Sequence, residues 1–100
     1  MFFATWKPAT DLLSAGNEWL VKMELAGVSP AEIQMVALRN VLHVKGRRRD
    51  LQLQSRYTWH TLEISYTDFE RIITLPAIID AASIRCEYQD GILQIYLSTL

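Results

Sequence analysis

Residues 83–97 read SIRCEYQDGILQIYL, and this stretch decides the fold class. Apolar and polar side chains alternate on both sides of Asp90-Gly91, as they do in strands with one buried face. Asp-Gly is a strong signal for a tight hairpin, because the turn needs residues that tolerate left-handed backbone. The stretch therefore predicts an antiparallel hairpin of Ser83–Tyr88 with Ile92–Leu97.

The same period of two recurs upstream, and it predicts strands over residues 10–13, 19–25, 33–38, 41–45, 62–64 and 69–75. Asn40 is expected to take the left-handed conformation in one turn, and Pro76 to end a strand. Seven or eight short strands without a long helix predict an all-β, immunoglobulin-like antiparallel β-sandwich.

Length and composition favour a single domain: the chain has 100 residues, and 50% of them are hydrophobic. Ten Lys and Arg residues stand against eleven Asp and Glu residues, so we expect neither a nucleic-acid nor a membrane partner. Arg47-Arg48-Arg49 is the local exception, and we interpret it as a solvated loop or an intersubunit salt-bridge site.

The residues that carry chemistry are few. Cys86 is the single cysteine, which excludes an internal disulfide and suits a reducing cytoplasm. Its strand pattern predicts a small core side chain. His43 and His60 are the only histidines, and we expect both to be structural. We therefore predict no catalytic residue, no metal site and no cofactor.

Four short stretches in a fixed order resemble the α-crystallin domain of the small heat-shock proteins, and the likeness runs from about Lys7 to Leu97. They are residues 25–28 (LAGV), 42–48 (LHVKGRR), 69–76 (FERIITLP) and 88–93 (YQDGIL). Trp59-His60 with Glu63 is also similar to the family's long loop.

This resemblance implies an ATP-independent chaperone, or holdase, that binds non-native proteins, and not an enzyme. Alternatives are a co-chaperone adaptor of the related CS-domain type, or a capping subunit that regulates larger small heat-shock oligomers. Residues 1–8 are expected to form a short arm, 9–97 the domain, and 98–100 an end without an extension motif. The exposed apolar side chains of the arm would be Phe2, Phe3 and Trp6.

The family's bacterial and plant-like members exchange a strand of the long loop, which implies a homodimer here. Residues 51–59 would add to the partner's first strand, at about Ala9 to Leu13. The expected interface residues are Leu51, Leu53, Tyr57, Trp59 and Arg71. Glu63 or Glu70 is expected near Arg71.

A groove between residues 33–38 and 83–88 resembles the place where the family docks an Ile-x-Ile/Val segment. Its candidate lining is Ile33, Met35, Ile84 and Cys86, although the sequence leaves open which alternate residues face it. Val36 and Leu38 are apolar where the family pattern is polar, and we expect them to widen an exposed apolar strip.

Overall fold

A computed structural model of the chain describes residues 5–50 and 56–100. Within these residues the chain forms seven strands and the short 3-10 helix η1 (Pro30–Glu32). The strands are β1 (Thr10–Ala15), β2 (Glu18–Glu24), β3 (Ile33–Leu38), β4 (Val41–Arg47), β5 (Asp68–Thr74), β6 (Ile79–Gln89) and β7 (Ile92–Thr99). No helix in the described ranges is long and apolar enough to cross a membrane.

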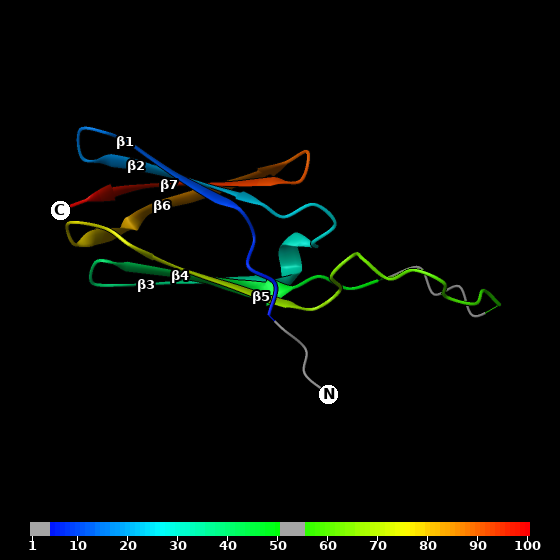
Figure 1. The fold of residues 1–100 in the computed structure, drawn as a ribbon. Coiled ribbons are helices and arrows are strands. Elements are labelled where there is room, and N and C mark those ends of the chain that lie inside the picture. The colour runs from blue at the N-terminus through cyan, green and yellow to red at the C-terminus, as the bar shows by residue number, and fades with distance from the viewer. Residues whose placement is uncertain (1–4, 51–55) are drawn as a thin grey trace.

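The strands form two antiparallel sheets that lie face to face (Figure 1). One sheet has the order β1-β2-β7-β6, and the other has the order β3-β4-β5. This arrangement confirms the predicted all-β sandwich. The strand predicted over residues 62–64 is wrong: these residues lie in the long connection between β4 and β5 and form no strand.

Three tight hairpin turns place left-handed residues where the sandwich needs them, and in the turn between β1 and β2 this residue is Gly16, with a φ of 62°. Asp90 and Gly91 have φ values of 54° and 79°, as expected for the turn between β6 and β7. In the turn between β3 and β4 the left-handed residue is Arg39, with a φ of 57°, so the expectation for Asn40 is wrong. The Asn40 side chain instead donates a hydrogen bond to the Leu75 carbonyl at 3.0 Å.

The core lies between the sheets and is built from the alternate residues that face inward. Both sheets and the turns next to them contribute buried apolar side chains: Val21, Met23, Leu25, Val28, Leu42, Val44, Phe69, Ile73, Leu75, Ile79, Leu93, Ile95 and Leu97. Burial of this much apolar surface is the main force that holds the two sheets together.

Gly46 allows η1 to lie directly against β4. A Cβ atom at this position would overlap the Glu32 carbonyl oxygen and would lie 2.6 Å from the Phe69 ring. Any larger residue would therefore force η1 or the Phe69 ring to move. The position of η1 also brings Glu32 to the start of the long loop.

Candidate functional site

The long connection between β4 and β5 projects away from the sandwich. Its described return limb, residues 56–67, extends beyond the ends of the strands (Figure 1). Tyr57 and Trp59 are exposed there, and so are Leu62, Ile64 and Tyr66. Large apolar side chains on a projecting loop are typical of an interaction surface.

The predicted interface residues of the loop are only partly described. Leu51 and Leu53 lie outside the described residues. Residues 56–59 form no strand within the single chain, so the strand expected over residues 51–59 stays a prediction. A strand at this place would need a neighbouring strand, because its backbone N–H and C=O groups would otherwise have no hydrogen-bond partners.

β1 offers a free strand edge on the same molecule. Among the described strands it is the outer one of its sheet, and it pairs there with β2 alone. Leu12 is directly opposite the buried Val21 and so faces inward, yet 43% of its surface is exposed because no strand covers the edge. An open edge of this kind can accept an added strand.

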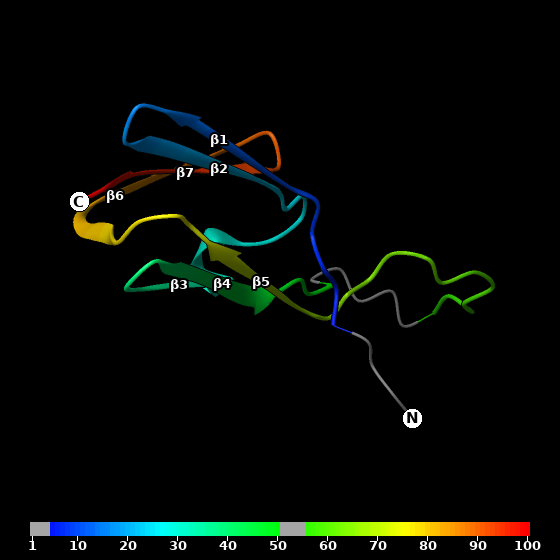
Figure 2. The same cartoon turned by 60° about the vertical axis from the view of Figure 1, so that its left-hand side comes forward.

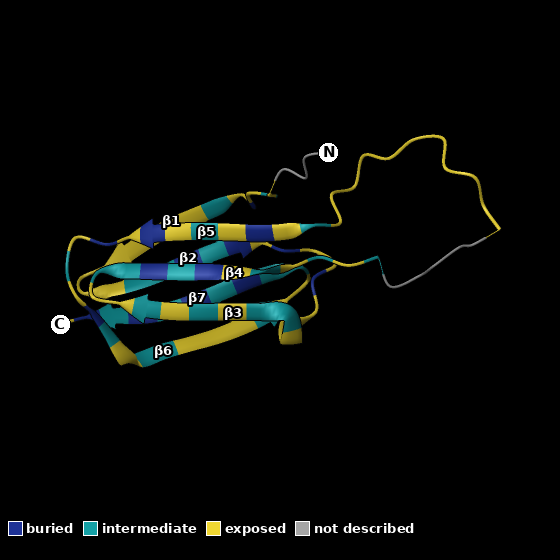
Figure 3. Cartoon of the chain, turned by 90° about the horizontal axis from the view of Figure 1, so that it is seen from below, coloured by how far each residue is buried: buried dark blue, intermediate teal, exposed yellow. Residues whose placement is uncertain are grey.

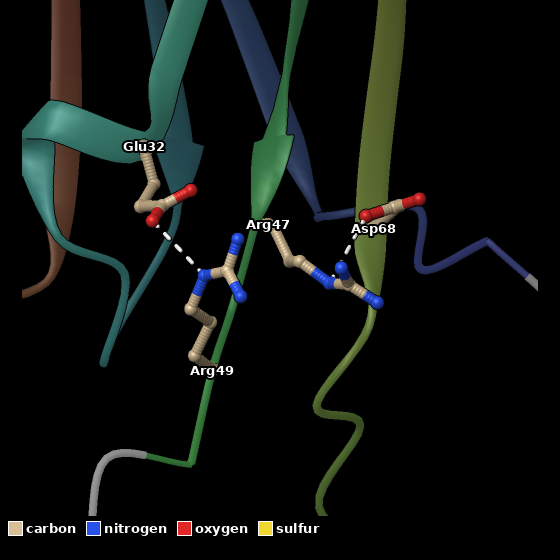
Figure 4. Close-up of polar contacts among 4 residues, drawn as sticks. All are labelled: Glu32, Arg47, Arg49 and Asp68. Carbon is tan, nitrogen blue, oxygen red and sulfur yellow. Dashed lines mark hydrogen bonds and ion pairs between the residues drawn. The ribbon is translucent and has the colours of Figure 1, made fainter.

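Arg47 and Arg49 tie the start of the long loop to the sandwich (Figure 4). The Arg47 Nε atom lies 3.3 Å from the Asp68 Oδ1 atom, and the Arg49 Nε atom lies 2.9 Å from the Glu32 Oε1 atom. Both ion pairs are formed within one chain, so in this structure Arg47 and Arg49 hold the start of the long loop against the sandwich. Exposed pairs of this kind stabilise a fold only modestly.

Arg48 joins three segments that are distant in sequence. Its guanidinium lies 3.8 Å from the centre of the Trp6 ring. It also donates hydrogen bonds to the carbonyls of Ser65, at 2.9 Å, and Ala26, at 3.1 Å. The N-terminal segment, the return limb of the loop and the turn after β2 therefore meet at one side chain.

The expectation that Trp6 belongs to an exposed arm is wrong. Its amide donates to the Asp68 carbonyl at 2.8 Å, and its ring meets the buried Phe69 ring edge to face at a centroid distance of 5.8 Å. Trp6 is half-buried, and the segment after it crosses from β5 to β1 (Figure 2). Phe2 and Phe3 lie outside the described residues.

Arg71 lies on the inward face of β5, because it is directly opposite the buried Val44. One of its terminal nitrogens donates to the Pro8 carbonyl at 3.4 Å. Its Nε atom is buried and has no acceptor among the described residues. No ion pair joins it to Glu63 or Glu70 in the part of the chain that is described, and Glu70 instead lies 3.5 Å from His43.

The β3–β6 edge, which we define as Ile33, Met35, Ala37, Ile84, Cys86 and Tyr88, collects the predicted groove residues. Met35 is opposite the buried Val44, and Cys86 is opposite the buried Ile95, so both side chains face inward. The register thus resolves which alternate residues line this edge. Except for Cys86, these side chains are half-buried and lie beside the core.

Cys86 is not the core residue that its strand pattern predicts. It is exposed, because it lies on an edge strand. Although the residue is exposed as a whole, desolvation of its thiol raises the thiol pKa above the ordinary value. A raised pKa lowers the thiolate fraction at neutral pH, which disfavours a reactive cysteine.

The two histidines are far from a metal-site arrangement. His43 Nε2 lies 3.5 Å from the Glu70 carboxylate, and His60 is exposed on the loop. Across residues 5–50 and 56–100, no three His, Cys, Asp or Glu side chains are placed to hold a metal ion.

Known proteins share both this sequence pattern and this fold. Residues 11–100 match the model of the Hsp20/alpha crystallin family. Small heat shock protein C4 of Rickettsia felis is 30% identical over 88 residues, which cover 88% of this chain and 54% of that protein. The 22.0 kDa heat shock protein of Arabidopsis thaliana is 29% identical over 96 residues, which cover 95% of this chain and 46% of that protein. The chain thus spans about half the length of the curated relatives that it matches.

Solved structures agree with these sequence matches. Heat shock protein 16.0 from Schizosaccharomyces pombe superposes with a TM-score of 0.86 at 25% identity, covering 95% of this chain and 88% of that one. The hspA protein from Xanthomonas axonopodis gives a TM-score of 0.81 at 25% identity, covering 96% of both chains. The chain therefore belongs to the Hsp20/alpha crystallin family, a family of ATP-independent chaperones and not of enzymes.

Proposed function

We propose that this domain is the body of an ATP-independent holdase that keeps non-native proteins from aggregating in the cytoplasm. Family membership is the observation that carries the proposal. It is supported by the exposed apolar side chains on the long loop and at the sheet edges. Such surfaces can hold non-native chains through burial of apolar area alone.

We further propose a homodimer in which each loop adds residues 51–59 to β1 of the partner. Two features support this arrangement: β1 is an open edge, and Tyr57 and Trp59 are exposed on the loop. Backbone hydrogen bonds would pair the strands, and the aromatic rings would supply anchoring area. An exchange in both directions gives a closed two-fold dimer.

Arg71 supports the same dimer. Its Nε atom is buried without an acceptor among the described residues, and buried donors almost always have a partner. We propose that a carboxylate of the partner subunit accepts this hydrogen bond. Charge-assisted bonds of this kind are stronger than neutral ones, so the pair would also fix the register of the dimer.

The β3–β6 edge is the proposed docking place for an extended Ile-x-Ile/Val segment. Alternate side chains of such a segment would lie against Met35 from one sheet and Ile84 from the other. The segment could belong to a small heat-shock relative, and co-assembly with one would then follow.

The test is solution mass by multi-angle light scattering, combined with nucleotide-free suppression of client aggregation. Three proteins are compared: the wild type, a variant with residues 51–59 replaced by a Gly-Ser linker, and Tyr57→Ala with Trp59→Ala. We expect a wild-type dimer, a monomeric linker variant and a weakened double variant. The double variant keeps the test valid if the linker variant fails to fold.

Each contrary result has a separate meaning. The proposed holdase function is refuted if the wild-type protein does not slow client aggregation at an equimolar ratio. An unchanged mass in both variants refutes the strand exchange. A wild-type monomer favours the CS-domain type of adaptor, and incorporation into a full-length relative's oligomer without client binding favours the capping subunit.

A further inference from the structure

The outer face of the three-stranded sheet is divided into a charged half and an apolar half. The register aligns Gln34, Lys45 and Glu70 in one row across the strands. The next two rows, toward the turn between β3 and β4, are Val36-His43-Ile72 and Leu38-Val41-Thr74. Figure 3 looks onto this face, where exposed residues alternate with more buried ones along β3 and β5.

We name the side chains of Val36, Leu38, Val41 and Ile72 the outer apolar patch. Val36 is 58% exposed, Leu38 70% and Ile72 59%, while Val41 is half-buried. These side chains face away from the core, so they do not contribute to the packing of the two sheets against each other. The patch also borders a hollow of about 500 Å³ that Val36, Leu38, Arg39, Asn40, Val41 and His43 line.

Charge at the rim of the hollow restricts what can occupy it. Arg39 is exposed and has no side-chain hydrogen bond or ion pair in the described part of the chain. On the same face the register places Glu70 two residues from Ile72, and its carboxylate lies 3.5 Å from His43. A carboxylate beside the patch would therefore meet an unpaired cation, and a second cation would be repelled.

The spacing and the area restrict the occupant further. Val36 and Leu38 are two residues apart on a strand, roughly 6.6 Å, which is the spacing of alternate side chains in any extended segment. Four apolar side chains are few against the roughly 20–30 residues per side of a stable interface. The patch thus fits a short extended segment that binds transiently, and it is too small to hold a stable dimer alone.

We propose that the outer apolar patch and Arg39 bind an extended apolar segment of a non-native protein that carries an acidic residue beside its apolar side chains. This inference rests on the proposed chaperone function and names a second place where that function is performed. It differs from the loop and from the β1 edge, because its residues lie on the outer face of the three-stranded sheet or in the turn between β3 and β4. It differs from the β3–β6 edge, because the β3 residues of that edge face inward.

The experiment uses the full chain and a labelled synthetic peptide with leucine at alternate positions and one flanking glutamate. Binding is followed by fluorescence anisotropy and by methyl NMR shifts of the wild type. Val36→Thr with Leu38→Thr removes the apolar character and places at both positions a β-branched residue that suits a strand. Leu38→Val is the matched control, because valine has nearly the shape of threonine without the hydroxyl.

We expect shifts at the patch methyls, a loss of affinity of at least about tenfold in the double threonine variant, and little change in Leu38→Val. Replacing the peptide's glutamate by lysine, or Arg39 by asparagine, should weaken binding as well. Asparagine is chosen since it tolerates the left-handed backbone at this position.

Three outcomes overturn the inference. The first is equal peptide binding by the wild type and the double threonine variant. The second is a concentration-dependent wild-type mass that the double variant loses, which makes a second copy the occupant. The third is a wild type that binds phospholipid vesicles instead of the peptide. Suppression of client aggregation is measured in parallel. If the double threonine variant suppresses aggregation and binds the peptide as well as the wild type does, this inference is refuted but the proposed function is not.

Discussion

Trp59→Ala tests the proposed dimer at a single side chain. Trp59 is 58% exposed in the single chain, which is about 145 Å² of the roughly 250 Å² that a tryptophan can bury. At about 25 cal/mol per Å², complete burial of this area in a partner corresponds to ~3.6 kcal/mol. Ordering of the loop opposes part of this gain, so we expect a loss of ~2 kcal/mol for each ring. The two-fold dimer buries two such rings, which corresponds to ~4 kcal/mol and a roughly 1000-fold weaker dimer.

Sedimentation equilibrium over a dilution series measures the dimer dissociation constant directly. Leu62→Ala is the control, because Leu62 is exposed on the same loop but lies outside residues 51–59. Trp59→Phe should recover part of the affinity, since it keeps an aromatic ring. The reasoning is refuted if Trp59→Ala dimerises as tightly as the wild type, or if Leu62→Ala loses as much affinity.

Three further predictions concern the fold and its cysteine. Gly46→Ala should lower the melting temperature in circular dichroism by at least ~5 °C, because the added methyl overlaps the backbone of η1 and the Phe69 ring; an unchanged melting temperature would show that η1 moves freely. Arg48→Ala should lower the free energy of unfolding in urea by about 1–2 kcal/mol, since it removes a cation–π contact and two hydrogen bonds. Arg47→Ala removes only an exposed ion pair and should lose less than ~1 kcal/mol, so equal losses would contradict the role of Arg48. Because desolvation raises the pKa of the Cys86 thiol, its alkylation by iodoacetamide should reach half of its maximal rate at a higher pH than that of a cysteine in a short peptide. A midpoint at lower pH would mean an activated thiol.

Much of the fold was predictable because its signals are local. The alternation around Asp90-Gly91 and the upstream strands depends on side-chain period and turn chemistry, which neighbouring residues specify. The turn between β3 and β4 shows the limit of such reasoning. Asparagine tolerates left-handed backbone, yet Asn40 uses its side chain to bond the distant Leu75 carbonyl, and Arg39 takes the left-handed position.

The candidate site was less predictable because its residues act through distant partners. Tyr57 and Trp59 were predicted as interface residues from the resemblance of the long loop, and both are exposed in the single chain. The half-buried position of Trp6 was not predicted, because it depends on Phe69 and Arg48, far along the chain. No pattern near Trp6 reveals those neighbours.

The sequence by itself determined the class of fold and the family, since strand period, turn residues and the order of four short stretches are written along the chain. Only the tertiary structure decided which alternate side chains face the core and which face solvent. Cys86 shows the physical reason: its strand pattern and its inward direction are those of a core residue, yet it is exposed because β6 is the last strand of its sheet. Burial depends on what lies across from a residue, and that is settled by the pairing of sheets and not by the strand alone.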